Sequence, residues 1–438
     1  MQHTVKTPRT LQILFWLLAA VVCVLPFHAF FSTWAGMYTG QLLFWKVWKE
    51  LLLLVGILLL LGWLLADSTR LRVLLRQPFV VAAVVFALVV ALVTAVNSSE
   101  LQVAPLFGGL AMTLRYVAAA VLAFAVVWFA PELWQRWRQP FVRYFLAASA
   151  VVAFFGLWQV SYMPADFMQQ FGYEKGVSIA PLSLISEKET TRRAFGTLRG
   201  PNEFGAFMLL PLMLTMLTVV RPWKKYALLA LFSAAIVASS GRSVWLGMIA
   251  GFVVLLGAVA YEKKILLRRI FVSGVGVVLA LLALLFAAFS IPSLRLQVFH
   301  SSPQDTSLTT GSTDDHLAAT AAGAERVLAD PLGCGAGCAG PASVYGDEPR
   351  IAESYYVQVA EEYGVVGLGV WLVLFVVVMR GLWARRSDRL ALWVFICGVT
   401  IGVVGLLLHI WSDDPLSITW WLLAGAVLAS QNAPEKSC

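Results

Sequence analysis

Charged residues are scarce in this sequence, because Asp, Glu, Lys and Arg together supply only 13% of its 438 residues. A soluble domain carries about a quarter charged residues and is about half apolar. Here 60% of the residues are hydrophobic, and the mean hydropathy is +0.81. This shortage of charge excludes a soluble enzyme.

The sequence also lacks the motifs of several kinds of chemistry. Its five cysteines form no cluster with histidine that has the spacing of a metal site, and no segment resembles a Ser-His-Asp triad or a nucleotide-binding fold. It contains no 20–50-residue repeat and no inverted pair of broken helices, which weighs against a secondary transporter. Cys334 and Cys338 lie in a Gly-rich segment where a disulfide is permitted but not required.

Long apolar runs are what the sequence does contain, and a membrane span needs about 20 such residues. We therefore expect an all-α polytopic membrane protein with about twelve transmembrane helices. The expected helices start near Leu11, Glu50, Phe79, Gly109, Phe141, Phe204, Tyr226, Val244, Arg269, Gly364, Leu390 and Pro415. No small-residue cleavage site follows the first run, so it is expected to be an uncleaved span.

Basic residues set the expected orientation. The formal net charge of +8 could suggest nucleic-acid binding, but the basic residues fall in short clusters between apolar runs, such as Arg70, Arg72 and Arg76. Cytoplasmic loops of membrane proteins carry such clusters. We expect both termini to be cytoplasmic.

Two long segments interrupt the short connections, and both are expected on the outer, periplasmic side. Long loops in compact proteins are usually functional or disordered, and the apolar stretches within these two predict partly helical structure. The expected division is 1–162 for the first five helices, 163–203 for the first loop, 204–290 for helices six to nine, 291–361 for the second loop and 362–438 for the last three helices with a cytoplasmic tail. Activity is expected where the loops meet the spans.

Three arginines in the first long loop are candidates for binding phosphate. Arg192, Arg193 and Arg199 precede a predicted span on the side of the membrane where cytoplasmic bias does not explain them. The planar guanidinium group pairs with two phosphate oxygens at once, and Gly196 and Gly200 would let the backbone turn closely around a ligand. The alternative is a solvated basic loop.

Ionisable residues within or beside spans are costly and are functional candidates by default. Arg115 lies midway along the fourth predicted span, Arg242 lies in the turn between two spans, and His409 ends the eleventh span. Arg242 either binds phosphate or snorkels at the membrane interface. Arg115 and His409 are expected to be internally paired.

The second long loop supplies a candidate base. Ser312, followed three residues later by Asp315, is typical of a helix start and places His316 in the first turn of a short helix. The helix dipole would favour a neutral imidazole there, which suits a proton acceptor. The alternative is a surface histidine that caps a short helix.

A second candidate for acid–base chemistry precedes the tenth predicted span. At helical spacing, Glu353, Tyr356, Glu361 and Gly364 share one face. Carboxylates on a face that runs into the membrane are hard to explain by packing, and acid–base catalysis needs a carboxylate near the reacting hydroxyl. Alternatively, they pair with the loop arginines for structural reasons.

These stretches resemble the bacterial O-antigen polymerase and O-antigen ligase family of membrane glycosyltransferases. Residues 193–204 resemble its Arg-x-x-Gly-Thr and Pro-Asn segment, and residues 241–246 resemble its Gly-Arg turn. Residues 330–337 and 356–364 resemble its Pro-Leu-x-Gly-x-Gly turn and Tyr-Leu-Gln…Glu-x-Gly helix. The resemblance covers roughly residues 190 to 410.

The chain departs from the family pattern at one position. Ligases and many relatives carry a His-Asn pair where this sequence has Glu353 and Ser354, and that histidine is their presumed base. Either Glu353 takes over the role in place, or His316 supplies the imidazole.

The resemblance implies a GT-C-like fold and an inverting transfer, without metal or other cofactor, from undecaprenyl-diphosphate-linked oligosaccharide to a sugar hydroxyl outside the membrane. The implied partners are that donor, a glycan or lipid A-core acceptor, membrane lipid and a chain-length regulator, with no nucleic acid. The implied catalytic candidates are Glu353 and His316, the pyrophosphate-binding candidates are Arg193, Arg242 and Arg199, and the substrate-binding candidates are Asn202, Glu203, Tyr356, Gln358 and Glu361.

Three functions are carried forward. The first is a polymerase of lipid-linked repeat units for O-antigen, capsule or exopolysaccharide. The second is a ligase that transfers finished glycan to lipid A-core. The third is a transporter of polysaccharide precursors, against which stand the one-sided long loops and the scarcity of charge along the helix interiors.

Overall fold

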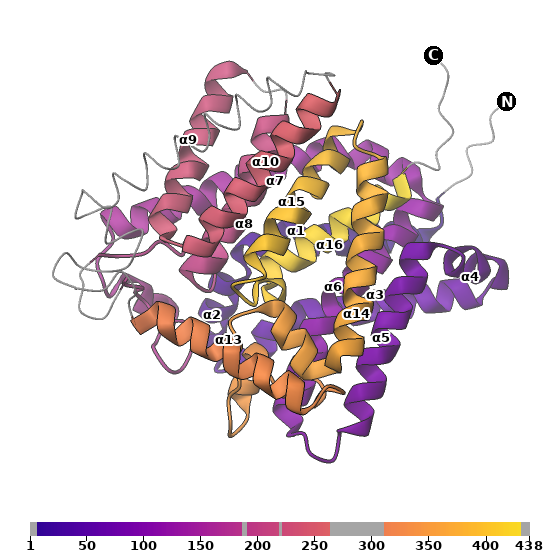
Figure 1. Ribbon diagram of the computed structural model, residues 1–438. Coiled ribbons are helices and arrows are strands. Elements are labelled where there is room, and N and C mark those ends of the chain that lie inside the picture. The colour runs from indigo at the N-terminus through magenta and orange to yellow at the C-terminus, as the bar shows by residue number, and fades with distance from the viewer. Residues whose placement is uncertain (1–6, 186–190, 219–220, 263–310, 431–438) are drawn as a thin grey trace.

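The computed structural model describes residues 7–185, 191–218, 221–262 and 311–430, and within these residues it is helical, with a single isolated β-bridge between Leu184 and Arg192 (Figure 1). The first seven α-helices are α1 (Arg9–Val24), α2 (His28–Thr39), α3 (Leu42–Leu65), α4 (Ser68–Leu75), α5 (Pro78–Val96), α6 (Val103–Phe129) and α7 (Pro131–Ser161). The others are α8 (Pro201–Leu217), α9 (Pro222–Ser239), α10 (Arg242–Glu262), α13 (Gly311–Ala329), α14 (Tyr355–Ala384), α15 (Arg389–Val404) and α16 (Asp414–Ala429). The described residues also form four short 3₁₀ helices: η1 (Leu25–Phe27), η2 (Phe167–Phe171), η3 (Gly340–Tyr345) and η4 (Ile410–Ser412).

Many of these helices are long and apolar enough to cross a membrane. Seven described segments meet both criteria: Arg9–Thr39, Leu42–Leu65, Pro78–Val96, Val103–Phe129, Pro131–Ser161, Arg242–Tyr261 and Tyr355–Ala384. Three shorter apolar helices accompany them, α8, α15 and α16. Every predicted span start lies in a described helix except the one near Arg269, which lies outside the described residues. The prediction of an all-α polytopic membrane protein is confirmed.

Local sequence explains where several helices begin. Proline occupies a first-turn position in α5, α7, α8, α9 and α16, where its missing N–H costs nothing and its fixed φ suits the helix. Asp388 and Asp413 cap α15 and α16, because each side chain accepts a hydrogen bond from a first-turn N–H group.

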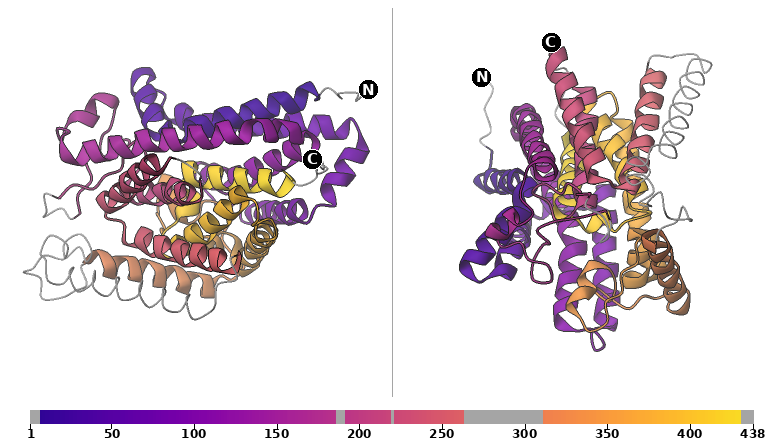
Figure 2. Two further views of the ribbon diagram at one scale, coloured as in Figure 1. Left: turned by 90° about the horizontal axis from the view of Figure 1, so that it is seen from above. Right: turned by 90° about the vertical axis from the view of Figure 1, so that its left-hand side faces the viewer.

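The core lies where α16 packs against α6, with α16 enclosed by other helices (Figures 1 and 2). A Cβ atom at Gly425 would lie 2.1 Å from the carbonyl oxygen of Ala120, so this close approach requires glycine. Tyr116 stacks on Trp421, with ring centroids 5.3 Å apart, and its hydroxyl accepts a hydrogen bond from Trp371. The aromatic core therefore fixes α6, α14 and α16 relative to one another.

Two helices differ from their predicted form, and both bear on the site. The helix α13 begins at Gly311, so Ser312 lies inside it and His316 lies in its second turn instead of its first. The helix α14 begins only at Tyr355, because Ser354 has an extended backbone, so Glu353 precedes the helix and is not on the face predicted for it. Gly364, with φ of +71°, kinks α14 where it meets the second loop.

Candidate functional site

The segment before α8 is held rigidly by neighbouring backbone and by a buried glutamine. The N–H of Arg193 donates to the carbonyl of Ser183 at 2.8 Å. The N–H groups of Phe195 and Gly196 both donate to Oε1 of Gln159, at 3.1 and 3.0 Å. Gly196 has φ of +57°, a conformation that favours glycine. These hydrogen bonds fix the backbone from which the side chain of Arg193 extends.

Arg193 reaches from this segment to the turn between α9 and α10. Its Nε donates to the carbonyl of Ser239 at 2.9 Å, and its Nη2 donates to Oδ1 of Asn202 at 2.8 Å. Burial, and then the positive charge of Arg242, lowers the pKa of Arg193 to about 10. Two neighbouring guanidinium groups, one of them held by neutral oxygens, favour an anionic ligand. Arg193, predicted to bind pyrophosphate, thus lies against Asn202, predicted to bind substrate, and against the turn that carries Arg242.

Arg199 and Glu203 form a second pair at the start of α8. Nη2 of Arg199 lies 3.4 Å from Oε1 of Glu203, and the arginine side chain remains 45% exposed. Burial lowers the pKa of Arg199, but the negative charges of Glu203 and Asp413 more than offset this, so the net shift is upward. Arg199 thus has solvent access and carboxylates around it.

The two candidate bases contact each other. Nδ1 of His316, on α13, lies 3.1 Å from Oε2 of Glu353, just before α14. Burial raises the pKa of Glu353, but the hydrogen bond and charge of His316 outweigh burial and lower it overall. If Nδ1–H donates to this carboxylate, Nε2 carries the free lone pair, as in a His–carboxylate pair whose acid orients the base. Glu353 and His316, which the sequence left as alternative candidates for the base, therefore form one hydrogen-bonded pair.

His409 lies in the turn after α15, and the charges of both pairs act on its pKa. Burial, and next the positive charge of Arg199, lowers its pKa. Glu203 and Glu353 both act on the pKa of His409 in the opposite direction. Its Nδ1 is buried without a hydrogen-bond partner among the described residues, in contrast to the internal pairing expected for it.

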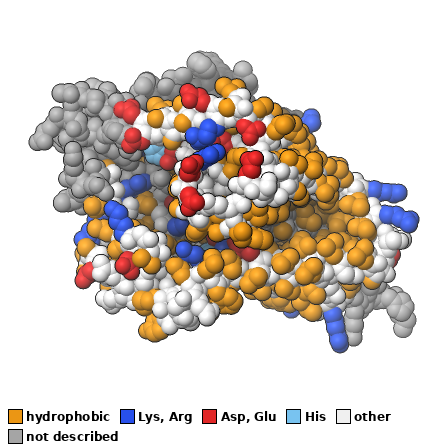
Figure 3. All heavy atoms as spheres, turned by 90° about the horizontal axis from the view of Figure 1, so that it is seen from below, with side chains coloured by type: hydrophobic (Ala, Val, Ile, Leu, Met, Phe, Trp, Pro, Cys, Tyr) orange, Lys and Arg blue, Asp and Glu red, His pale blue; other side chains and the backbone are white. Residues whose placement is uncertain are grey.

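We call Arg193, Arg199, Glu203, His316, Glu353 and His409 the charged cluster. Its members come from the first long loop, the start of α8, α13, the residues before α14 and the turn after α15. Figure 3 shows Lys, Arg, Asp and Glu side chains gathered beside a recess on one part of the face seen there, with a largely apolar surface next to it. A charged recess beside an apolar surface suits an amphiphilic substrate.

Asp413, the residue that caps α16, lies behind this cluster. Its carboxylate accepts from the N–H of Leu416 at 3.1 Å, and its side chain is buried. Burial, followed by the negative charges of Glu203 and Asp414, raises the pKa of Asp413 to about 7.

The predicted substrate residues on α14 are engaged in internal contacts. The hydroxyl of Tyr356 donates to the carbonyl of Gly402 at 2.8 Å. Gln358 is buried beneath Gly340, and the carboxylate of Glu361 is ion-paired with Arg326. The structure does not bring these three side chains to the charged cluster, so we leave them out of the proposed binding site.

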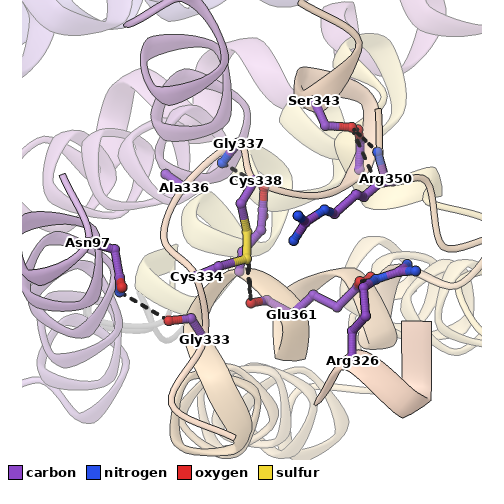
Figure 4. Close-up of a disulfide and its surroundings, with 12 residues drawn as sticks. Asn97, Arg326, Gly333, Cys334, Ala336, Gly337, Cys338, Ser343, Arg350 and Glu361 are labelled. Carbon is purple, nitrogen blue, oxygen red and sulfur yellow. Dashed lines mark hydrogen bonds and ion pairs between the residues drawn. A yellow bond between two sulfur atoms is a disulfide. The ribbon is translucent and has the colours of Figure 1, made fainter. Parts of the chain in front are cut away.

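A Gly-rich turn and a disulfide join the second loop to α14 (Figure 4). Cys334 and Cys338 are bonded to each other, with Cα atoms 6.0 Å apart, and the N–H of Cys334 donates to the carbonyl of Glu361 at 3.0 Å. The carbonyl of Gly333 accepts from Asn97 of the turn after α5 at 3.0 Å. The turn therefore ties the α13–α14 segment, which carries His316 and Glu353, to the membrane helices.

Four charged side chains from α3, α6 and α16 form a buried ionic network that the sequence did not predict. Arg115 pairs with Glu50 at 2.8 Å and also contacts Asp414, which confirms that Arg115 is internally paired. Lys49 lies 3.1 Å from Glu50 and 2.9 Å from Asp414. The signal in the sequence was the charged stretch of residues 46–50 at the start of a predicted span, where ionisable side chains are costly.

In the part of the chain that the structure describes, no group of three or more His, Cys, Asp or Glu side chains has an arrangement that could hold a metal ion.

Comparison with known families supports the interpretation of the second half of the chain. A family model described as O-antigen ligase matches residues 227–372, which include Arg242, His316 and Glu353. No curated protein matches the chain. The match confirms, over residues 227–372, the resemblance predicted from the sequence: this part of the polytopic membrane protein is similar to the O-antigen ligase family.

Proposed function

We propose that this protein transfers a glycan from a lipid diphosphate to a sugar hydroxyl at the outer face of the bacterial inner membrane, with inversion at the anomeric carbon, and that it polymerises lipid-linked repeat units. The contact between His316 and Glu353 carries this proposal. It supplies an oriented base within electrostatic reach of His409, whose pKa is also lowered by the positive charge of Arg199 in the first loop.

The reaction needs one proton acceptor and one stabilised leaving group. The acceptor hydroxyl oxygen attacks the anomeric carbon from the face opposite the diphosphate, and Nε2 of His316 takes its proton. The bond from the anomeric carbon to the diphosphate oxygen breaks, and the lipid diphosphate leaves with the electron pair. Glu353 holds the imidazole in the tautomer that accepts a proton and stabilises the imidazolium that forms.

Arg193 and Arg242 meet the other requirement. Negative charge develops on the departing diphosphate, and fixed cations at that position stabilise the transition state more than the ground state. Arg193 is already held by Ser239 and Asn202, so little reorganisation is needed when the charge appears.

The test is a turnover assay with purified protein in EDTA. The substrate is undecaprenyl-diphosphate oligosaccharide, supplied with and without lipid A-core. A ladder of longer lipid-linked glycan without lipid A-core is expected from a polymerase. Product that forms only with lipid A-core would identify a ligase instead, and no product from folded wild-type protein would favour a transporter.

Variants assign the roles. His316→Ala should lower kcat by about 100- to 10,000-fold, the usual contribution of a general base. Glu353→Gln should lower kcat less, because the imidazole remains but loses its orienting acid. Arg193→Gln should also lower kcat, whereas Arg136→Gln, at the opposite end of the spans, serves as the matched control. Unchanged turnover in His316→Ala would contradict the assigned base.

A further inference from the structure

An open pocket of about 540 Å³ lies where α7, α8 and the start of α15 meet, and it is separate from the charged cluster. Glu353 lies before the first residue of α14, whereas Ser387, which lines the pocket, lies after its last residue. The 30 residues of α14 extend over roughly 45 Å between them. Figure 1 shows α13 beside the start of α14 and the connection to α15 at its other end. The reaction proposed above uses none of the residues that line this pocket.

Two guanidinium groups lie at the rim of the pocket. Nη1 of Arg138 donates to Oδ2 of Asp388 at 3.2 Å, and Nη1 of Arg389 donates to the carbonyl of Leu217 at 3.4 Å. Among the described residues, these are the only hydrogen-bond or ion-pair partners of the two side chains, so most of their N–H donors remain available. The Arg138 side chain is 40% exposed, and Arg389 is also exposed. Both arginines can therefore bind an anion that enters the pocket.

Asp388 determines which charge the pocket favours. Its Oδ1 accepts from the N–H of Leu390 at 2.9 Å, and its Oδ2 accepts from Arg138, so both carboxylate oxygens are engaged. A ligand with an ammonium group would find no free carboxylate here. Because the charged lining residues are two arginines and one aspartate, the lining carries one net positive charge. A phosphodiester, which has a single negative charge, matches it.

The floor of the pocket is apolar. Val142, Leu214 and Leu390 line it from α7, α8 and α15, and all three side chains are buried. A pocket with an apolar floor and a cationic rim favours an amphiphilic anion over a small inorganic one, because burial of hydrocarbon adds to the attraction between charges.

The surrounding side chains indicate that this pocket lies at a membrane boundary. Lys225, in the first turn of α9, donates to the carbonyl of Met216 at 2.8 Å, which joins the start of α9 to the end of α8. Beside it, Trp223 and Tyr226 expose 66% and 70% of their surface. Tryptophan and tyrosine gather at the level of the lipid headgroups. The pocket is therefore placed where the phosphate groups of phospholipids lie.

We propose that this pocket binds one anionic phospholipid of the phosphatidylglycerol class, with its phosphodiester held by Arg138 and Arg389. The side chains of Gln139 and Ser387, which also line the pocket, would hydrogen-bond to the glycerol headgroup. The apolar floor would cover the first carbons of an acyl chain. Basic pockets between membrane helices bind anionic headgroups in this way. The bound lipid is neither the donor nor the acceptor of the reaction proposed above.

Native mass spectrometry of the full-length protein in detergent tests the site, because it counts bound lipids and measures the affinity of each. Wild type should bind one phosphatidylglycerol about tenfold more tightly than phosphatidylethanolamine. Arg389→Gln should weaken this binding by about ten- to a hundredfold, the loss expected for one charge-assisted hydrogen bond, and so should Arg138→Gln. Arg136→Gln is the matched control and should leave it unchanged, because Arg136 lies on the same helix, over the ring of Trp137, and does not line the pocket.

Several results would overturn the proposal. An equal loss in Arg136→Gln would indicate a diffuse basic surface in place of a site, and equal affinity for phosphatidylethanolamine would contradict selection by charge. Displacement of the lipid by glycerophosphoglycerol, which has the same headgroup without acyl chains, at equal concentration would identify a site for a soluble anion. Folded wild-type protein that binds no phosphatidylglycerol would exclude the site.

Melting temperatures separate lipid binding from folding. Without lipid, Arg389→Gln should melt close to wild type, because the side chain is exposed and makes one long hydrogen bond. Saturating phosphatidylglycerol should raise the melting temperature of wild type and of Arg136→Gln more than that of Arg389→Gln, since a ligand stabilises only the state that binds it. The same rise in all three proteins would contradict a role for Arg389 in lipid binding.

Discussion

In the family pattern that the sequence resembles, Glu353 takes the place of a histidine, and its neighbour His316 comes from a different part of the second loop. Their side chains meet at 3.1 Å, so an imidazole is available although it does not come from the position of that histidine. An imidazole oriented by a carboxylate can act as a base wherever its chain originates, because the chemistry depends on geometry and not on sequence position. This is a physical reason to expect the departure to preserve activity.

The buried carboxyl group of Asp413 leads to a prediction about how the stability of the fold depends on pH. Its pKa is raised to about 7 in the folded protein by burial and neighbouring carboxylates, whereas an unfolded aspartate titrates near 3.9. Between these values the folded state binds the extra proton, so this group destabilises the fold as pH rises. Asp413→Asn keeps an oxygen that can accept from Leu416 but removes the titration. The melting temperature of this variant relative to wild type should rise between about pH 5 and pH 8.

The control for this prediction is another helix cap. Asp388 caps α15 but is 32% exposed and paired with Arg138 at 3.2 Å, so Asp388→Asn measures what the same substitution does at a solvent-accessible helix cap. A gain for Asp413→Asn that is the same at all pH values would point to packing and not to titration.

The helices α13 and α14 act as one unit because the Gly-rich turn between them is clamped onto α14. The N–H groups of Cys334 and Gly335 donate to the carbonyls of Glu361 and Glu362, at 3.0 and 2.8 Å. Gly337 also donates to Oε1 of Glu362 at 2.9 Å. The kink of α14 at Gly364 makes room for this turn.

Gly364→Ala should therefore loosen the unit. A Cβ atom there would lie 2.5 Å from the carbonyl oxygen of Pro331, and φ of +71° disfavours any other residue. The expected cost is about 1–3 kcal/mol, seen as a lower melting temperature, together with reduced turnover because His316 and Glu353 lose their mutual position. Gly369→Ala, in the same helix with no atom within 4 Å of the added Cβ, should leave both unchanged. Equal effects of the two substitutions would refute this role for the kink.

The molecule as a whole is organised around α16, whose side chains are almost all buried although it has only 16 residues. Its first residue, Asp414, joins the ionic network with Arg115 and Lys49, and its later turns pack against α6. Breaking a buried ion pair by removing one partner is costly, so this network holds α3, α6 and α16 in one arrangement behind the charged cluster.

The orientation of this assembly is open to a direct test. If the basic clusters are cytoplasmic, Glu348→Cys, at a side chain that is 84% exposed in the second loop, should react with a membrane-impermeant maleimide in intact spheroplasts. Arg72→Cys on α4 should react only after the membrane is opened. The reverse pattern would place the charged cluster in the cytoplasm and remove the lipid-linked substrate from its reach.

Much of the fold could be predicted because membrane spans are encoded locally. Each span is recognised from its own run of apolar residues, and prolines or aspartates mark several starts. The start of α14 was harder to predict, since the extended backbone of Ser354 depends on neighbours distant in sequence. Loop motifs singled out Arg193 and Arg242 as candidates, and the structure brings the side chain of Arg193 to the turn that precedes Arg242.

The sequence by itself determined the class of protein, the approximate spans and the family, because hydropathy and short motifs are properties of contiguous residues. Only the tertiary structure decided that His316 and Glu353 form a pair and that the carboxylate of Glu361 is ion-paired with Arg326. These two contacts join residues 37 and 35 positions apart, and no local pattern encodes them. They arise from how the helices and loops pack, which is why the chemistry of the site could be narrowed from the sequence but not assigned.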